Sequence, residues 1–291
     1  MNDFENKVAV VTGTANPQGI GYATCRRLAQ EGCRVVLADL DGEGAEARAA
    51  ELRSEGADAL AVATDMANRD DVERLAAMTY DHYGATHILL LNHVAPTGRT
   101  PGHGLLNPDT DAWVLHANVN LLGCIYAIKA FAHRMIDGGE HGHILATTSG
   151  AGATGTMYGN GPYAVTKAAI TSLMECLYGQ LRDVGADIVA SLVFPSVTST
   201  HGPVEIGERT VAMLRSGGVP VRLMEPDEVA VFTLDAIRRD TFWAQPDRDD
   251  ERNQETAAWQ AEIYRLRSEA IINQTPPDTY LWGPPSSLLG P

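Results

Sequence analysis

Short apolar runs alternate with longer helical patterns along most of the chain, and this alternation restricts the possible folds more than any other feature. Seven runs have the β-branched, two-sided apolar composition of strands that helices cover on both faces. They are residues 7–12, 34–39, 59–64, 87–92, 143–149, 187–194 and 241–245. Repeated strand–helix–strand units predict one doubly wound α/β domain, with a mainly parallel seven-stranded sheet and helices on both faces.

Composition excludes several other classes of protein. A chain of 291 residues can bury roughly three quarters of its unfolded surface, so it needs no metal or disulfide for stability. Its four cysteines lack metal-ligand spacing and are typical of buried thiols in a reducing cytoplasm. A formal charge of −15 would repel nucleic-acid phosphates. We find no apolar run of about 18 residues and no room for a signal peptide before Lys7, so we expect a cytoplasmic protein with no membrane partner.

The stretch VTGTANPQGIGYA, residues 11–23, joins the first strand-like run to a helical segment. Its glycines would let backbone N–H groups approach a pyrophosphate at a helix N-terminus. Five residues, 14–18, separate Gly13 from Gly19, more than in the commonest dinucleotide loop. The next run ends in Asp39, 20 residues after Gly19, where a carboxylate can accept hydrogen bonds from both ribose hydroxyls. Because that carboxylate would repel a 2′-phosphate, the pair of motifs predicts NAD rather than NADP.

Further motifs follow the loop in a fixed order. They are ADLD (38–41), TDM (64–66), LLLNHVA (89–95), HANVNLLG (116–123), LATTSGAG (145–152), YAVTK (163–167) and FPSVTST (194–200). Over roughly residues 5–245 the chain resembles the short-chain dehydrogenase/reductase family, which implies a Rossmann-type fold. The extended glycine loop is similar to that of the divergent enoyl-thioester reductases. Those reductases space their tyrosine and lysine more widely than Tyr163 and Lys167, so the resemblance implies alcohol and ketone chemistry instead.

Tyr163 and Lys167 lie four residues apart, which places both on one face of a helix. Hydride transfer to a ketone needs a proton for the forming alkoxide, and a tyrosine of pKa about 10 needs nearby positive charge to exchange it at neutral pH. The resemblance implies that Tyr163 is the acid and base and that Lys167 holds the nicotinamide ribose. It also implies that Ser149 hydrogen-bonds the substrate oxygen and that Asn120 holds a water next to the lysine.

Two of these assignments have rivals in the sequence. Thr147 and Thr148 compete with Ser149, which lies one residue from the commonest serine–tyrosine spacing. Asn118 competes with Asn120, which the Asn-Leu-x-Gly context favours. Taken singly, each catalytic candidate could also be an ordinary surface, turn or core residue.

Other cofactor contacts carry over from the resemblance by position. The predicted cofactor-binding residues are Gly13, Gly19, Ile20, Gly21, Asp39, Leu40, Asp65, Met66, Asn92, Tyr163, Lys167, Pro195, Thr198 and Thr200. The chain departs from the family pattern in two places. His93, Val94 and Ala95 replace the remainder of Asn-Asn-Ala-Gly, and Ser196 replaces a glycine. We predict no metal site, and we interpret His93 and His201 as polar wall or surface residues near the site.

The segments around the catalytic motifs predict the substrate and the assembly. We predict a pocket lined by Gly150, Ala151, Met157, Tyr158 and Val197. Its small and apolar walls favour a neutral, bulky secondary alcohol or ketone, aromatic or alicyclic. Residues 1–250 would form the catalytic domain, with a lid at 201–224, and residues 251–291 a helix and tail packed on this domain or on a neighbouring subunit. Residues 114–135 and 163–182 resemble the interface helices of family dimers and tetramers, so we expect a homo-oligomer.

The sequence therefore predicts an NAD-dependent oxidoreductase that interconverts a neutral, bulky secondary alcohol and its ketone. Two alternatives stay open. One is an enoyl-type reductase, and the other is a non-catalytic dinucleotide-binding regulator on the same fold. The joint presence of Asn120, Ser149, Tyr163 and Lys167 weighs against a regulator, because a sensor needs no proton donor.

Overall fold

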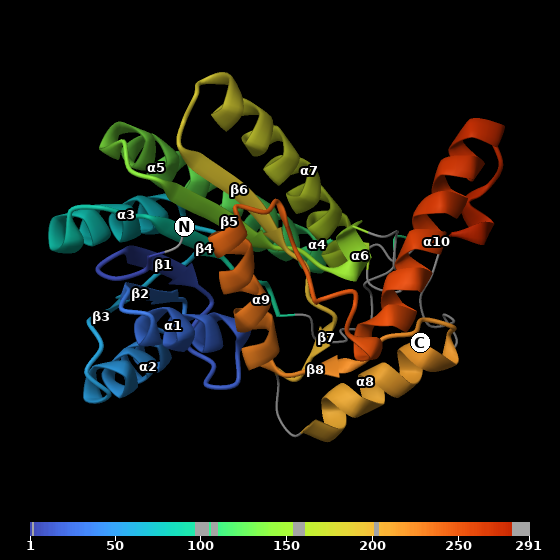
Figure 1. Ribbon diagram of the computed structural model, residues 1–291, viewed down its shortest axis with the longest axis horizontal. Helices are drawn as coiled ribbons and strands as arrows, with labels where there is room; N and C mark the ends of the chain where they lie inside the picture. The colour runs from blue at the N-terminus through green and yellow to red at the C-terminus, as the bar shows by residue number, and fades with distance from the viewer. Residues whose placement is uncertain (2, 97–104, 106–109, 154–160, 201–203, 281–291) are drawn as a thin grey trace.

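The structure, a computed structural model, describes all residues except 2, 97–104, 106–109, 154–160, 201–203 and 281–291 (Figure 1). A seven-stranded sheet has the order β3-β2-β1-β4-β5-β6-β9, and every neighbouring pair is parallel. Its strands are β1 (Val8–Thr12), β2 (Arg34–Asp39), β3 (Ala59–Ala63), β4 (Ile88–Leu91), β5 (Gly142–Thr147), β6 (Ile188–Val193) and β9 (Trp243–Ala244). The predicted doubly wound parallel sheet is confirmed.

Helices cover both faces of the sheet, so its strands are apolar on both sides. One face packs on α3 (Arg69–Tyr83), α5 (Gly123–Gly138) and α7 (Gly161–Asp183). The other packs on α1 (Ile20–Gln30), α2 (Gly42–Ser54) and α9 (Pro226–Arg239). Figure 1 shows these two helical layers above and below the sheet. The strand order reverses between β1 and β4, and in such sheets ligands bind at the carboxyl ends of the strands beside this point.

One long helical segment, Asp111–Gly138, contains three elements. A π-helical turn, Ala117–Leu122, separates α4 (Asp111–His116) from α5. In the part of the chain that the structure describes, this segment alone is long and apolar enough to cross a membrane by length and composition. Of its most apolar 18-residue window 39% is buried, and Cys124, Ala127 and Phe131 pack in the core against the sheet.

A smaller unit lies beyond β6 at the carboxyl edge. Two short strands, β7 (Val197–Thr198) and β8 (Leu223–Met224), pair in parallel and flank α8 (Val204–Ser216), which forms part of the predicted lid. Helix α10 (Glu251–Asn273) packs there through Trp259, which contacts a small cluster of Leu214, Val219 and Val221. A 3₁₀ turn (Pro277–Thr279) follows α10, and a short helix, α6 (Gly150–Ala153), follows β5. The division at residue 250 stays a prediction, and the tail from residue 281 lies outside the described residues.

Candidate active site

The glycine-rich loop turns sharply between β1 and α1. Gly13 has a φ of 75°, a left-handed conformation that glycine adopts without strain. A Cβ atom on Gly21 would lie 2.2 Å from the Gly13 carbonyl oxygen, so only glycine allows the first turn of α1 to approach the loop this closely. The two predicted glycines therefore make a backbone cradle that side chains would fill.

The N-terminus of α1 differs from those of other helices in the same chain. Its N-cap, Gly19, has no side-chain hydrogen bond to the helix, and its first turn contains no acidic residue. By contrast, Asp41, Asn68 and Asp250 cap the first N–H groups of α2, α3 and α10. The first N–H groups of α1 and its positive dipole end are thus free of internal carboxylates, as a phosphate-binding terminus requires.

Asp39 ends β2 beside this cradle. Its two carboxylate oxygens accept hydrogen bonds from the N–H groups of Ala15 (2.9 Å) and Asp41 (3.1 Å), which fix the side chain at the base of the loop. Next to it, the predicted cofactor residue Leu40 is 73% exposed. The extra loop residues have a structural role, because the Asn16 side chain donates to the Thr200 carbonyl. The longer loop is therefore tied to the segment after β6, which the sequence did not predict.

Asn92 links the glycine loop to β5 at the centre of the edge. Its Nδ2 donates to the Gly13 carbonyl (3.4 Å), and its Oδ1 accepts from the Thr147 hydroxyl (3.0 Å). The predicted adenine contacts lie after β3, where Met66 is buried and Asp65 accepts from the Ala67 N–H (2.9 Å). The predicted cofactor residues thus follow neighbouring strands β1 to β5 in sheet order.

Lys167 is buried beneath this edge. Its Nζ donates to the Thr147 carbonyl (2.7 Å) and lies 5.7 Å from the centroid of the Tyr163 ring. Burial lowers the pKa of Lys167 to about 8. Burial also raises the pKa of the Tyr163 hydroxyl, and a hydrogen bond with Ser149 opposes that rise. The sequence argument expected a lowered tyrosine pKa. In the protein alone, desolvation of the Tyr163 hydroxyl outweighs its hydrogen bond with Ser149, while the Lys167 ammonium donates to the Thr147 carbonyl.

The two threonines that compete with Ser149 have other partners. The Thr147 hydroxyl bonds Asn92, and the Thr148 hydroxyl donates to the Lys167 carbonyl (3.1 Å) beside Thr171. Ser149 is the one whose hydroxyl interacts with Tyr163. Both threonines therefore hold β5 in place, and the position of Ser149 matches that expected of a group that bonds the substrate oxygen.

Gly152 presses directly on the lysine backbone. A Cβ atom at this position would lie 2.4 Å from the Lys167 carbonyl carbon and 2.6 Å from its oxygen. The short helix α6 can therefore approach α7 only because residue 152 is glycine. The sequence did not predict this contact, because it joins residues 15 positions apart.

Asn120 lies in the π-helical turn and is fully buried. Its Oδ1 accepts from the Ala95 N–H (2.8 Å), and its Nδ2 donates to the Thr166 hydroxyl (3.0 Å), one residue before Lys167. π-Helical turns often occur at functional sites. The rival Asn118 is half-buried, and its carbonyl accepts from the Gly123 N–H. Asn120 thus joins the segment after β4 to the helix of Tyr163 and Lys167.

His93 is buried, which corrects its interpretation as a wall or surface residue. The Thr12 hydroxyl accepts the N–H groups of Asn92 and His93, so its own hydrogen points at one of two acceptors, His93 Nδ1 at 2.8 Å or the Leu90 carbonyl at 3.3 Å, and the shorter contact favours His93. The ring hydrogen then sits on Nε2, toward the Val119 carbonyl and 3.8 Å from Cys124 Sγ. Burial lowers the pKa of His93 to about 3, with a further contribution from Lys167. The ring is therefore neutral and packs the π turn against β1. His201 lies outside the described residues.

Less of the predicted substrate pocket can be located. Met157, Tyr158 and the Ala151 side chain lie outside the described residues. Gly150 begins α6 after Ser149, and Val197 packs against the small cluster beside α10. Pro195 and Thr198 lie in the segment between β6 and the lid. The Thr198 hydroxyl donates to the Ser196 carbonyl (3.0 Å).

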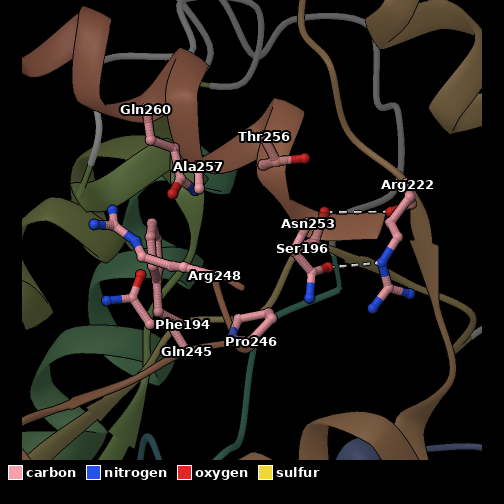
Figure 2. A pocket seen from close by; sticks show the side chains of 10 residues that line it. All are labelled: Phe194, Ser196, Arg222, Gln245, Pro246, Arg248, Asn253, Thr256, Ala257 and Gln260. Atoms are coloured by element: carbon pink, nitrogen blue, oxygen red, sulfur yellow. Dashed lines mark hydrogen bonds between the residues drawn. The ribbon is translucent and has the colours of Figure 1, made fainter. Parts of the chain in front are cut away.

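A cavity that is open to solvent lies between the ends of β6 and β9 and helix α10. Figure 2 shows its lining: Phe194, Ser196, Arg222, Gln245, Pro246, Arg248, Asn253, Thr256, Ala257 and Gln260. Ser196, which replaces the glycine of the family pattern, donates to the Arg222 carbonyl (3.2 Å), and the Arg222 guanidinium donates to Asn253 (2.9 Å). This cavity contains none of the predicted catalytic residues, and its walls come from four separate segments, so sequence reasoning missed it.

Comparison with known proteins agrees with this geometry. The family model for short chain dehydrogenases matches residues 7–210. The chain belongs to the short-chain dehydrogenase/reductase family. It is 30% identical over 227 residues to the (2S)-[(R)-hydroxy(phenyl)methyl]succinyl-CoA dehydrogenase subunit BbsD of Thauera aromatica, which covers 78% of this chain and 87% of that protein.

Solved structures of the family extend the comparison. A short-chain dehydrogenase/reductase from Burkholderia phymatum, in complex with NAD, has a TM-score of 0.77 and 27% identity, and the alignment covers 95% of this chain and 98% of that one. A metagenomic short-chain oxidoreductase in complex with NADP has a TM-score of 0.64 and 27% identity, with 81% and 92% covered. The chain is thus an oxidoreductase of a family whose members bind NAD or NADP.

Proposed function

We propose that this short-chain dehydrogenase/reductase interconverts a secondary alcohol and its ketone with NAD as cofactor. The observation that carries the proposal is the position of Lys167. Its ammonium is buried against the Tyr163 ring, at the carboxyl edge of the sheet, beside an uncapped helix N-terminus and a glycine cradle. The cradle, the free helix terminus and Asp39 fit a dinucleotide.

The chain's own groups would manage the proton. The nicotinamide, when bound, supplies or accepts the hydride. In ketone reduction the Tyr163 hydroxyl gives its proton to the carbonyl oxygen, and in alcohol oxidation it takes the proton back. Ser149 donates to that oxygen and stabilises the charge that develops on it. Burial alone raises the pKa of Tyr163, so Lys167 and the positive charge of oxidised nicotinamide together must favour the phenolate.

Cofactor choice is assigned to Asp39. Its carboxylate is held at the loop by two backbone N–H groups, and the segment Thr14–Gln18 contains no arginine or lysine that would bind a 2′-phosphate. We expect kcat/KM for NAD to exceed that for NADP by at least tenfold, about 1.4 kcal/mol. Asp39→Ala should lower the ratio of kcat/KM for NAD to kcat/KM for NADP. Asp58→Ala should leave that ratio unchanged, because Asp58 directly precedes β3, at the other end of the strands from Asp39. Equal kcat/KM for both cofactors in the wild type would contradict the assignment.

The proposed substrate is neutral and bulky, with an aromatic or alicyclic group. Support comes from the small residues after Ser149 and from the relative in Thauera aromatica, whose name describes a hydroxyl-bearing carbon attached to a phenyl ring. A panel measured by NADH absorbance should compare aryl and alicyclic alcohols and ketones with sugars, hydroxy acids and enoyl thioesters. A tenfold preference for any charged, sugar or enoyl substrate would overturn this part of the proposal. NADH binding without turnover on any compound would favour a regulator.

We also propose a cytoplasmic homo-oligomer. Exposed apolar side chains lie on the two helices that resemble family interfaces, with Val114 and Leu115 on α4 and Val165 and Tyr178 on α7. The four cysteines are all free thiols, which is consistent with a reducing compartment. Light scattering at micromolar concentration should give a dimer or tetramer, and a monomer would contradict the proposal.

A further inference from the structure

A second cluster of chemically active side chains lies at the opposite edge of the sheet, far from Tyr163. His141 precedes β5, His143 is its second residue, and Asp240 follows α9 before β9. One ligand atom from each of these residues lies within 4.8 Å of the other two. Three separate segments therefore bring two imidazoles and a carboxylate together, and the carboxylate also contacts the ammonium of Met1.

The spacing of the three groups suits a tetrahedral metal ion. Asp240 Oδ1 lies 3.1 Å from His141 Nε2 and 3.0 Å from His143 Nε2. Ligands held about 2.0–2.1 Å from a tetrahedral Zn²⁺ are roughly 3.3 Å from one another. The two separations to Asp240 are close to this value, and the two imidazoles, whose ligand atoms lie within 4.8 Å of each other, would move closer around a bound ion.

The nitrogen and carboxylate oxygen atoms of this cluster are closely spaced. His141 Nδ1 lies 2.7 Å from Asp187 Oδ1, while its Nε2 faces Asp240. A neutral imidazole donates from one nitrogen only, so a neutral His141 presents a lone pair to one of the two carboxylates. Asp240 Oδ1 also contacts the Met1 ammonium at 3.1 Å, which makes three nitrogens around an oxygen with two lone pairs. A second proton on His141 or a metal ion bound to its Nε2 would each satisfy the two carboxylates, and the titration below distinguishes them.

The surroundings match those of a metal ligand set. Asp187 is placed to accept the Nδ1–H of His141, the carboxylate–histidine arrangement that orients metal-binding imidazoles. His143 is fully buried. Two carboxylates against one ammonium leave a net negative charge. The Asp240 side chain is 48% exposed, which gives an ion access from solvent.

We propose that His141, His143 and Asp240 bind a divalent transition-metal ion of the zinc class, with Asp187 orienting His141. Such an ion would join the starts of β5 and β6 to the turn before β9, the shortest strand of the main sheet. Its role would be to stabilise this edge, and it takes no part in hydride transfer.

Zinc titration of the full-length, tag-free protein, first dialysed against a chelator, tests the proposal at pH 7.5. We expect one equivalent of Zn²⁺ to bind at micromolar concentration and to raise the melting temperature by about 5 °C at a hundredfold excess over Kd. His141→Asn, at a partly exposed position, should abolish that site, and Asp187→Asn should weaken it by about 10–100-fold. His133→Asn, on the exposed face of α5, serves as the matched control.

Each outcome bears on the proposal. Binding in the wild type and in His133→Asn, but not in a folded His141→Asn, supports it. Wild-type binding no tighter than that of His141→Asn overturns it, and so does an Asp187→Asn variant with unchanged affinity and unchanged melting shift. Far-ultraviolet circular dichroism establishes that each variant is folded before titration.

Discussion

The amino ends and the carboxyl ends of the strands, called here the amino edge and the carboxyl edge of the sheet, differ in whether their charged groups form ion pairs. At the amino edge, cationic groups meet carboxylates: Lys7 contacts Glu140, and the Met1 ammonium contacts Asp240. At the carboxyl edge, the buried ammonium of Lys167 donates to a carbonyl, and among the described residues no carboxylate forms an ion pair with it. Burying an unpaired charge costs stability. The buried, unpaired ammonium of Lys167 therefore lowers the stability of the fold at the carboxyl edge, whereas the cations at the amino edge are paired with carboxylates.

The difference also extends to packing. The carboxyl edge depends on glycines that let backbone approach backbone, at Gly21 against Gly13 and at Gly152 against Lys167. Its helix α1 lacks the side-chain caps of α2 and α3. Free N–H groups, a close backbone and an unpaired cation are the features that a bound dinucleotide and a tyrosine acid would use. Three predictions test whether this edge is built for function at the expense of stability.

The largest expected effect is on turnover. Tyr163→Phe removes the proton donor, so we expect kcat to fall by about 10²–10⁴-fold while NADH binding is retained. Tyr178→Phe is the matched control, because Tyr178 lies exposed on the same helix and should keep full activity. Steady-state NADH absorbance and NADH fluorescence titration measure the two quantities. Wild-type turnover by Tyr163→Phe would refute the assigned mechanism.

The second prediction concerns stability and pH. The pKa of Lys167 is about 8 in the folded chain and about 10.5 when exposed. Between these values the unfolded state binds more protons, so wild-type stability should rise with pH from about 8 to 10.5. Lys167→Met should abolish activity, stabilise the protein at pH 7 by up to about 3 kcal/mol, and remove that rise.

Urea unfolding at pH 7, 8.5 and 10 checks this outcome. Lys129→Met, on the exposed surface of α5, provides the control and should change stability little. A Lys167→Met variant that is less stable than wild type at pH 7 would show that the buried ammonium does not destabilise the folded protein. That result would contradict the comparison of the two edges.

The smallest expected effect comes from replacing glycine with alanine at two sites, one in close contact with backbone and one in open space. Gly152→Ala forces a methyl group against the Lys167 backbone, so it should destabilise by about 1–3 kcal/mol and reduce kcat. At Gly179, in the same layer, nothing lies within 4 Å of an added Cβ, and Gly179→Ala should stabilise by about 0.5–1 kcal/mol. Thermal unfolding of both variants gives the comparison. If the two substitutions change the melting temperature equally, the close contact between residue 152 and the Lys167 backbone does not affect stability.

The parallel sheet could be predicted because its strands carry the signal locally. Runs such as residues 7–12 and 34–39 are apolar on both faces, and only a covered parallel sheet requires this. The π-helical turn at 117–122, the helix α6 and the pair β7–β8 were not predicted. These short elements depend on partners far along the chain, as Val197 pairs with Leu223, and their own sequence has no periodicity to reveal them.

The site divides in the same way. Gly13, Gly21 and Asp39 lie at strand–helix junctions, where local sequence sets the backbone, so their places followed from the motif. The burial of His93 depends on Thr12 and Cys124, which belong to other elements. The raised pKa of Tyr163 depends on desolvation, which no spacing rule contains. Contacts that only tertiary packing creates were therefore the ones that the sequence left out.

The central claim is that the carboxyl edge, and not the amino edge, receives the dinucleotide. Hydrogen–deuterium exchange of the full chain, with and without saturating NADH, tests it without a known substrate. We predict slower exchange in peptides that cover residues 11–23 and 147–153, and unchanged exchange in peptides that cover residues 139–143 and 238–242. If NADH binds but leaves residues 11–23 unprotected, or protects only the amino edge, the account is wrong.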